Sequence, residues 1–136
     1  MGIVESPDRQ SIIIIDRKFP PLGLSFPRGM SEVGETIELT AIREVMEETK
    51  ISAKPKGLLG VISDPKHDPR WHVVMICIVM ETKDEKDPEG SDDAKSASWA
   101  KYDSDSFFDE LTKSSKILLD DYRKYRRGEL QLLELR

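Results

Sequence analysis

The sequence predicts an α+β fold, because short runs of β-branched and apolar residues alternate with two stretches of helical periodicity. The strand-like segments are residues 11–15, 57–63, 71–82 and 96–102. The helical segments are residues 36–49 and 106–127. With 136 residues, no internal repeat and no second-domain linker, the chain is expected to form one domain spanning residues 1–136.

The strand-like segments differ in how they are expected to be covered. Residues 11–15 are strongly β-branched and are followed by the Pro20-Pro21 and Gly23 breakers, which is typical of a short buried strand. Residues 71–82 are apolar at alternate positions on both faces, which predicts a strand covered on both sides. Phe26 precedes a loop, and we expect it to lie in the core rather than on a base-stacking surface.

Each helical segment has one apolar side. The segment 36–49 follows Ser31, Gly34 and Glu35, and Pro55 limits it soon after its end. The side expected to pack on the sheet consists of Leu39, Ile42, Val45, Met46 and Thr49. The buried side expected for the segment 106–127 consists of Phe107, Phe108, Leu111, Leu118, Leu119 and Tyr122.

Composition narrows the class of partner and the compartment. The chain has 26 acidic and 21 basic residues and a net charge of −5, which disfavours a nucleic-acid polymer, and the basic residues 122–127 are interpreted as a solvated helix end. The single cysteine, Cys77, lies in an apolar run and is expected to be a small buried hydrophobe rather than a nucleophile. With no targeting pattern and no apolar run near the roughly 20 residues of a membrane span, the expected location is the cytoplasm.

Three acids of the first helix share one stripe. Glu44, Glu47 and Glu48 stand at i, i+3 and i+4, so with about 3.6 residues per turn their carboxylates lie on one side. Mg²⁺ prefers such hard oxygen ligands and shares its remaining positions with substrate phosphates. The like-charge pair of Glu44 and Glu48 costs only about 0.2–0.5 kcal/mol, so the alternative of an ordinary solvated face stays open on spacing alone.

A longer pattern around these acids closely resembles the Nudix box, GX5EX7REUXEEXGU, in which U is a bulky aliphatic residue. Eight of its nine specified positions match, and only Lys50 departs, where the motif has glycine. The matching residues are Gly29, Glu35, Arg43, Glu44, Val45, Glu47, Glu48 and Ile51. Residues 14–27, residues 63–70 and Asp92-Asp93-Ala94 followed by Trp99 also resemble the ADP-ribose pyrophosphatase branch of this family.

The resemblance implies a fold and a reaction. The fold is an α/β/α sandwich with a mixed β-sheet, in which the box forms a loop, a helix and a second loop. The reaction is hydrolysis of a diphosphate linkage, in which water attacks phosphorus while Mg²⁺ or Mn²⁺ screens the developing charge. The expected substrate is ADP-ribose or a related nucleotide sugar, and the expected products are a nucleoside monophosphate and a sugar phosphate. A homodimer is also a family expectation.

The resemblance also assigns roles to residues. Glu44, Glu47 and Glu48 would bind the metal with Glu48 as the first choice, Glu35 would complete the cluster, and Arg43 would orient a glutamate. The general base would be Glu47 or an acid of the loop 84–93. The preferred loop acid is Asp93, followed by Asp92 and Glu89.

Two departures bear on the site. Lys50 stands where a helix commonly ends in the left-handed conformation, which costs a residue with a side chain roughly 1 kcal/mol. Arg28 replaces a glycine that often precedes Gly29, and it would either contact a substrate phosphate or obstruct the pocket. The expected substrate-binding residues are Arg28, Gly29 and Arg70. For Arg70 and Trp71, support of a dimer partner is an equally compatible role.

Other readings of the pattern are weaker or remain open. The loop 84–93 aligns with a calcium-binding EF-hand only up to its twelfth position, which is Ser96, and strands are expected on both sides of it. His67 and His72 lack the spacing of a zinc site, and a packed or hydrogen-bonded role is favoured for His72. Two alternative functions stay open: a house-cleaning nucleoside triphosphate pyrophosphohydrolase, and a noncatalytic nucleotide-binding sensor suggested by Arg28 and Lys50.

Overall fold

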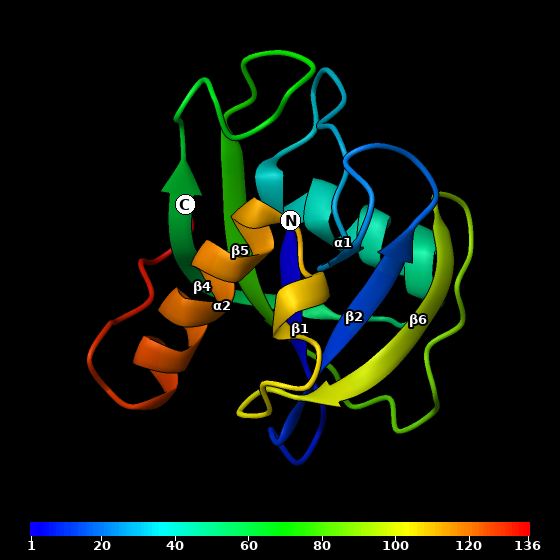
Figure 1. The fold of residues 1–136 in the computed structure, drawn as a ribbon. Helices are drawn as coiled ribbons and strands as arrows, with labels where there is room; N and C mark the ends of the chain where they lie inside the picture. Colours follow the sequence, from blue (N-terminus) through cyan, green and yellow to red (C-terminus); the bar gives the residue numbers. More distant parts are fainter.

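The chain folds around one mixed sheet with a helix on each side. A computed structural model describes all residues from Met1 to Arg136. The elements are β1 (Gly2–Glu5), β2 (Ser11–Arg17), β3 (Leu24–Ser25), α1 (Ile37–Thr49), β4 (Lys54–Ile62), β5 (Met75–Glu81), β6 (Ala94–Lys101), the 3₁₀ turn η1 (Phe108–Glu110) and α2 (Lys113–Arg126). Figure 1 shows α1 and α2 on opposite sides of the sheet.

The sheet combines parallel and antiparallel pairs. Its main path runs β3-β2-β1-β5-β4, and β6 pairs with β2 outside this path. The strands β1 and β5 are parallel, whereas β4 with β5, β2 with β6 and β2 with its two other neighbours are antiparallel. The mixed sheet expected from the family resemblance is therefore confirmed.

Strand β2 contributes side chains to both hydrophobic cores, one on each side of the sheet. Ile12 and Ile14 belong to the core that includes Leu118 and Tyr122 of α2. Ile13 and Ile15 belong to the other core, on the side of α1. Because successive side chains of a strand point to opposite faces, a run of isoleucines fits only a strand buried on both sides. The strand β5 alternates in the same way, which confirms the double coverage predicted for it.

Helix α1 begins and ends as its sequence predicts. The side chain of Thr36, the N-cap, accepts a hydrogen bond of 3.2 Å from the Leu39 backbone N–H. At the other end Lys50 adopts the left-handed conformation with φ 62°, and its N–H bonds to the Met46 carbonyl oxygen. The strained position expected from the missing glycine is therefore present, and it does not prevent the helix from ending where the motif ends.

The prediction of the packed side of α1 was partly wrong. Leu39 and Met46 are exposed, with relative accessibilities of 54% and 41%. The buried residues are Thr40, Ala41, Glu44, Val45, Glu48 and Thr49. The apolar contact with the core is therefore made by Ala41 and Val45, while Leu39 and Met46 lie outside it.

Element boundaries also differ from the sequence prediction. Strand β5 starts at Met75 rather than at Trp71, and α2 starts at Lys113 rather than at residue 106. Phe107 and Leu111 still reach the core, from the irregular segment around η1.

The prediction for Phe26 is confirmed, since the side chain is fully buried. Cys77 is buried as expected, and its burial raises the pKa of the thiol to about 12. No helix has both the length and the apolar character needed to cross a membrane.

Candidate active site

A cavity of about 870 Å³ opens beside the N-terminal loop and inner face of α1. This volume is within the usual range of small-molecule sites, roughly 300–1,000 Å³. Its lining contains both acids and arginines. The acids in its lining are Glu32, Glu44, Glu48, Asp68, Asp92 and Asp93, and the arginines are Arg17, Arg28, Arg43 and Arg70. Hydrophobic residues, including Phe19, Met30 and Trp71, complete the lining.

Two glutamates of α1 are buried at the cavity wall. The relative accessibilities of Glu44 and Glu48 are 8% and 1%. Burial raises the pKa of Glu48 to about 8, with Glu44 adding repulsion and the Arg28 N–H opposing the shift. Burial also raises the pKa of Glu44, although Arg43 opposes that shift. These carboxyl groups would be more favourably ionised if a cation lay between them and the cavity.

The segment before α1 packs its backbone onto both carboxyl groups. The backbone N–H of Arg28 donates to Glu48 Oε2 over 3.2 Å. At the next residue, a Cβ atom placed on Gly29 would overlap the Glu44 carboxylate. Glycine is required at position 29 for this close approach, which gives the first residue of the motif a steric role.

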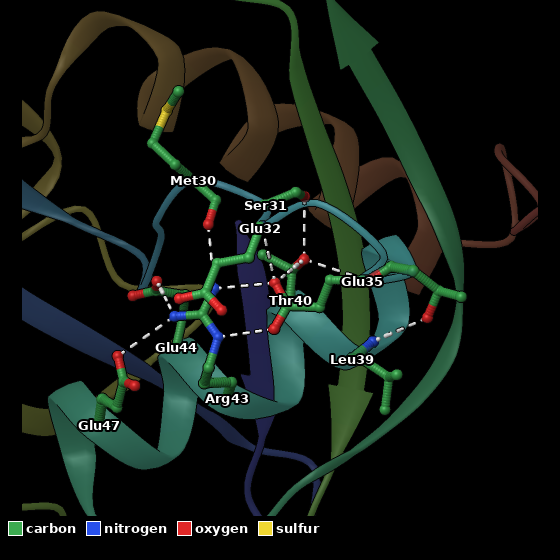
Figure 2. Close-up of polar contacts among 10 residues, drawn as sticks. Met30, Ser31, Glu32, Glu35, Leu39, Thr40, Arg43, Glu44 and Glu47 are labelled. Atoms are coloured by element: carbon green, nitrogen blue, oxygen red, sulfur yellow. Dashed lines mark hydrogen bonds and ion pairs between the residues drawn. The ribbon is translucent and has the colours of Figure 1, made fainter.

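Arg43 joins this segment to the helix, as Figure 2 shows. Its guanidinium donates to Glu35 through Nε over 2.7 Å and through Nη2 over 2.9 Å. It also donates to Glu44 Oε1 over 2.7 Å and to the Met30 carbonyl oxygen over 3.0 Å. The bidentate pair lowers the pKa of Glu35 to about 2. Arg43 thereby fixes the orientation of Glu44 and the path of the loop.

Not all of the predicted metal ligands face the cavity. Glu35 and Glu47 are absent from its lining, and Glu47 Oε2 lies 3.4 Å from Arg43 Nη1 with 43% of its side chain exposed. As placed, no three His, Cys, Asp or Glu side chains converge closely enough to hold a metal ion. The structure therefore brings Glu44 and Glu48 together at the cavity and leaves Glu47 on the solvent side of Arg43.

The donor chemistry of the wall fits a hard divalent cation. Glu44 and Glu48 are buried carboxyl groups at the cavity, and besides burial, repulsion from Asp92 raises the pKa of Glu44 and repulsion from Asp93 raises the pKa of Glu48. Carboxylate oxygens are the ligands that Mg²⁺ and Mn²⁺ prefer. For Glu47 to join this set, its side chain would have to leave Arg43 and rotate toward Glu44 and Glu48.

The acidic loop between β5 and β6 is attached to the end of α1. The backbone N–H groups of Glu89 and Ser91 donate to the carbonyl oxygens of Thr49 and Glu48, over 2.9 and 3.1 Å. These carbonyls have no partner within the helix, so the loop caps them. The attachment places Asp92 and Asp93 at the cavity, whereas the side chain of Glu89 does not line it. Of the three loop acids considered, two line the cavity.

The cavity lining also contains arginines. Arg28 and Arg70, both expected to bind substrate, line the cavity together with Arg17, which the sequence reasoning missed. Arg70 is paired with Asp68 through Nε at 3.1 Å and Nη2 at 3.0 Å. Asp68 was also missed, because nothing in a polar loop sequence indicates that one of its acids is 5% exposed. Trp71 is exposed, and the Arg70 guanidinium lies 5.0 Å from its ring centroid.

The two histidines contact backbone carbonyl oxygens, and the acidic loop joins two strands. His72 Nε2 lies 2.8 Å from the Ser63 carbonyl oxygen, which confirms its hydrogen-bonded role. His67 Nδ1 contacts the Asp64 carbonyl oxygen at 2.8 Å, while its buried Nε2 has no partner. The acidic loop is flanked by strands β5 and β6, as expected, and not by the two helices of an EF-hand.

Comparison with known proteins agrees with the geometry. The NUDIX domain family model matches residues 1–121. The ADP-ribose pyrophosphatase of Methanocaldococcus jannaschii is 36% identical over 134 residues, covering 93% of this chain and 73% of that protein.

Solved structures share the fold. A NUDIX hydrolase from Nitrosomonas europaea has a TM-score of 0.78 at 18% identity, covering 98% of this chain and 76% of that chain. The NUDIX domain of Shewanella oneidensis NrtR, solved with ADP ribose, has a TM-score of 0.75 at 16% identity, covering 92% and 84% of the two chains. At such identities these structures support the α+β sandwich alone. Because the family model matches most of the chain and a relative is 36% identical along nearly all of it, the chain belongs to the Nudix family and is a pyrophosphohydrolase.

Proposed function

We propose that this enzyme is a divalent-metal-dependent pyrophosphatase of ADP-ribose or a related nucleotide sugar. The observation that carries the proposal is a cavity whose lining combines the buried carboxyl groups of Glu44 and Glu48 with the arginines Arg17, Arg28, Arg43 and Arg70. Carboxylates would bind the metal ion, and arginines would bind the negatively charged diphosphate. The similarity to the ADP-ribose pyrophosphatase of Methanocaldococcus jannaschii supports the choice of substrate.

The proposed ligands of Mg²⁺ or Mn²⁺ are Glu48, Glu44 and Glu47, with Glu35 completing the acidic cluster. A bound divalent cation would act as a Lewis acid toward phosphate oxygens and water. Glu48 is the first-choice ligand because it is 1% exposed and contacts no side-chain cation. Arg43 holds Glu44 and Glu35 in place through its hydrogen bonds.

The proposed reaction is hydrolysis of the diphosphate linkage. The oxygen of water forms a bond to one phosphorus, the bond from that phosphorus to the bridging oxygen breaks, and the second phosphate leaves. A carboxylate must accept the proton that water loses. We assign this role to Asp93, which lines the cavity, with Glu47 as the alternative. Gly29 allows the chain to approach the substrate closely, while Arg28 and Arg70 contact its phosphates.

Product analysis tests the proposal. ADP-ribose is incubated with the enzyme and Mg²⁺ in ¹⁸O-labelled water, and AMP and ribose 5-phosphate are examined by mass spectrometry. We expect both products, with the label in one of them, which identifies the attacked phosphorus. Long incubation that leaves ADP-ribose intact, although it binds, would instead favour the noncatalytic sensor.

A substrate panel separates the two enzymatic alternatives. Relative kcat/KM values are measured for ADP-ribose, other nucleotide sugars and nucleoside triphosphates. We expect ADP-ribose or another nucleotide sugar to rank first. A triphosphate ranking first would assign the enzyme to the house-cleaning group. We also propose a cytoplasmic homodimer, for which fractionation and light scattering are the direct measurements.

A further inference from the structure

The C-terminal segment, residues 128–136, lies against the outer edge of the sheet. Strand β4 is the last strand of the sheet path, so no other named strand pairs with its outer side. Leu133 forms an isolated antiparallel bridge with Leu58 of β4. The Leu58 N–H donates to the Leu133 carbonyl oxygen over 2.8 Å, and the Leu133 N–H donates back over 2.9 Å. Figure 1 shows this segment in red beside β4.

Strand β4 accommodates the C-terminal segment because Gly57 has no side chain. A Cβ atom at this position would lie 2.8 Å from the Leu132 Cβ atom and 3.0 Å from the Leu133 carbonyl oxygen. Both distances are shorter than an ordinary van der Waals contact. Gly60 of the same strand differs, since a Cβ atom there would come no nearer than 3.8 Å to its neighbours. Glycine at position 57 therefore lets the segment approach the backbone of β4 closely.

Leucines of the C-terminal segment pack on both sides of the sheet edge. Leu130 and Leu132 are partly buried against the core on the side of α2. Leu135 is partly buried against the other core, on the side of α1. An extended chain directs successive side chains to opposite faces, so it can contact both cores from the edge between them. The segment thus combines backbone pairing with apolar contacts on each face of the sheet.

Without the C-terminal segment, β4 would be suited to pairing with β4 of a second copy. An open edge strand presents unpaired N–H and C=O groups, which readily pair with the edge of another molecule. Antiparallel pairing of two β4 strands about Leu58 would place Lys54 opposite Ile62. The same register would place Lys56 opposite Gly60, so no two lysines would face each other. Like-charge repulsion across the strands therefore does not oppose this contact.

We infer that the outer edge of β4 is a strand-acceptor site, which the C-terminal segment occupies as a cover that prevents pairing with β4 of a second copy. The class of ligand that fits the site is an extended strand rich in leucine. No residue of the segment lines the candidate active-site cavity, so the inference is independent of the proposed function. It requires the proposed homodimer to use a surface other than this edge.

Hydrogen exchange of the Leu58 amide tests the cover, because the Leu133 carbonyl oxygen is its acceptor. The full-length variants Gly57→Ala and Gly60→Ala are compared with the wild type by NMR in dilute solution. In Gly57→Ala the added methyl group displaces the segment, and the Leu58 amide should exchange roughly tenfold faster or more. Gly60→Ala is the matched control and should keep the wild-type rate. Equal rates in the two variants would overturn the inference.

Analytical ultracentrifugation tests what the cover prevents. Leu133→Pro removes the N–H that bonds to the Leu58 carbonyl oxygen, and Gln131→Pro is the matched control, because the Gln131 N–H makes no hydrogen bond. We expect Leu133→Pro and Gly57→Ala to gain an association step that doubles the mass as concentration rises. Gln131→Pro should behave as the wild type. A mass that does not change with concentration in either tested variant would contradict pairing through β4.

A peptide added in trans separates strand pairing from nonspecific aggregation. The peptide has the sequence of residues 129–136 and is added in excess to associated Leu133→Pro protein. It should restore the mass of the wild type, because it supplies the N–H that the altered segment lacks. The same peptide carrying Leu133→Pro should be roughly tenfold less effective or worse. Association that persists in excess peptide would show aggregation instead of a strand-acceptor site.

Discussion

Gly29 lies directly against the carboxylate of Glu44, so closely that a Cβ atom at position 29 would overlap it. We predict that Gly29→Ala pushes Glu44 away from the cavity and lowers kcat for ADP-ribose at least tenfold. Gly60→Ala is the matched control, because a Cβ there would come no nearer than 3.8 Å to its neighbours. Steady-state kinetics of both variants provide the measurement, and unchanged kcat in Gly29→Ala would contradict the packing role.

Glu48→Gln should separate stability from activity. Glutamine still accepts the Arg28 N–H, but it is a poor metal ligand, so kcat should fall at least 100-fold. Because burial raises the pKa of Glu48 to about 8, a neutral side chain suits this position, and melting in EDTA should occur no lower than in the wild type. Glu85→Gln removes an exposed charge outside the cavity and should leave kcat unchanged. Wild-type turnover in Glu48→Gln would reject the assigned ligand.

Lys50→Gly should stabilise the protein. Lys50 has φ 62°, a conformation that glycine adopts without the steric cost borne by lysine. We expect a gain of about 0.5–1 kcal/mol in the free energy of unfolding, the loss of backbone entropy by glycine limiting it. Urea denaturation measures the gain. Lys54→Gly, at an exposed strand position, should instead destabilise the protein, and a similar loss in Lys50→Gly would show that the left-handed turn carries no strain.

The pair of Asp68 and Arg70 predicts a pH-dependent stability. The Arg70 side chain lowers the pKa of Asp68 from 3.8 to about 2, so the folded state binds the proton of this group more weakly than the unfolded state. The stabilisation is complete above about pH 4 and disappears as the pH falls toward about 2. It should amount to roughly 1–2 kcal/mol, since one pKa unit is about 1.4 kcal/mol and the partly exposed arginine allows screening by solvent.

Urea denaturation of Asp68→Asn and the wild type at several pH values checks this prediction. The variant should be less stable at pH 6 and should approach the wild type as the pH falls to 3 and below. A difference that stays constant from pH 6 to 3 would mean that the carboxylate charge is not responsible.

Glu5 is a fully buried acid that does not line the candidate site. Its carboxylate is fully buried and contacts Lys56 Nζ at 2.8 Å and the Tyr122 hydroxyl at 2.8 Å, with Arg9 at 3.5 Å. Glu5→Gln removes the charge that Lys56 and Arg9 contact, and because their side chains are 23% and 49% exposed the loss should be about 1.5–3 kcal/mol of stability. The exposed acid Glu129 pairs with Arg127, so Glu129→Gln should cost less than about 1 kcal/mol. Chemical denaturation compares the two, and equal losses would contradict the network.

The sequence was most informative about features that depend on the spacing of neighbouring residues. The motif correctly predicted α1 and the left-handed Lys50, because each depends on local spacing. It also indicated that Arg43 orients a glutamate, although not that Glu35 is its bidentate partner. Burial of the alternating strands also followed from pattern alone. The covered side of α1 did not, because Ala41 and Thr49 make the contact while Leu39 remains exposed. Hydrophobicity indicates which residues of a helix favour burial, but the packing of the helix against the sheet determines which of them are buried.

Features that depend on distant segments were not predictable in this way. The burial of Asp68 and Glu5 follows from how loops and α2 fold over them, and a single sequence has no local sign of it. The same holds for β1, which has only four residues, and for the acidic loop, which Ser91 attaches to Glu48. The burial of Tyr122 was predicted, whereas the hydrogen bond of 3.0 Å that Arg126 of the basic helix end donates to the Tyr122 hydroxyl was not.

The run of four isoleucines in β2 is bracketed by two polar residues, Ser11 and Asp16. A shift by one residue would put one isoleucine where another had been in each core, so the apolar run by itself does not specify the register. The penalty arises at the ends, where such a shift would force Ser11 or Asp16 into an apolar environment. The two polar residues that bracket the run thus align the strand, and this alignment brings Arg17 to the cavity.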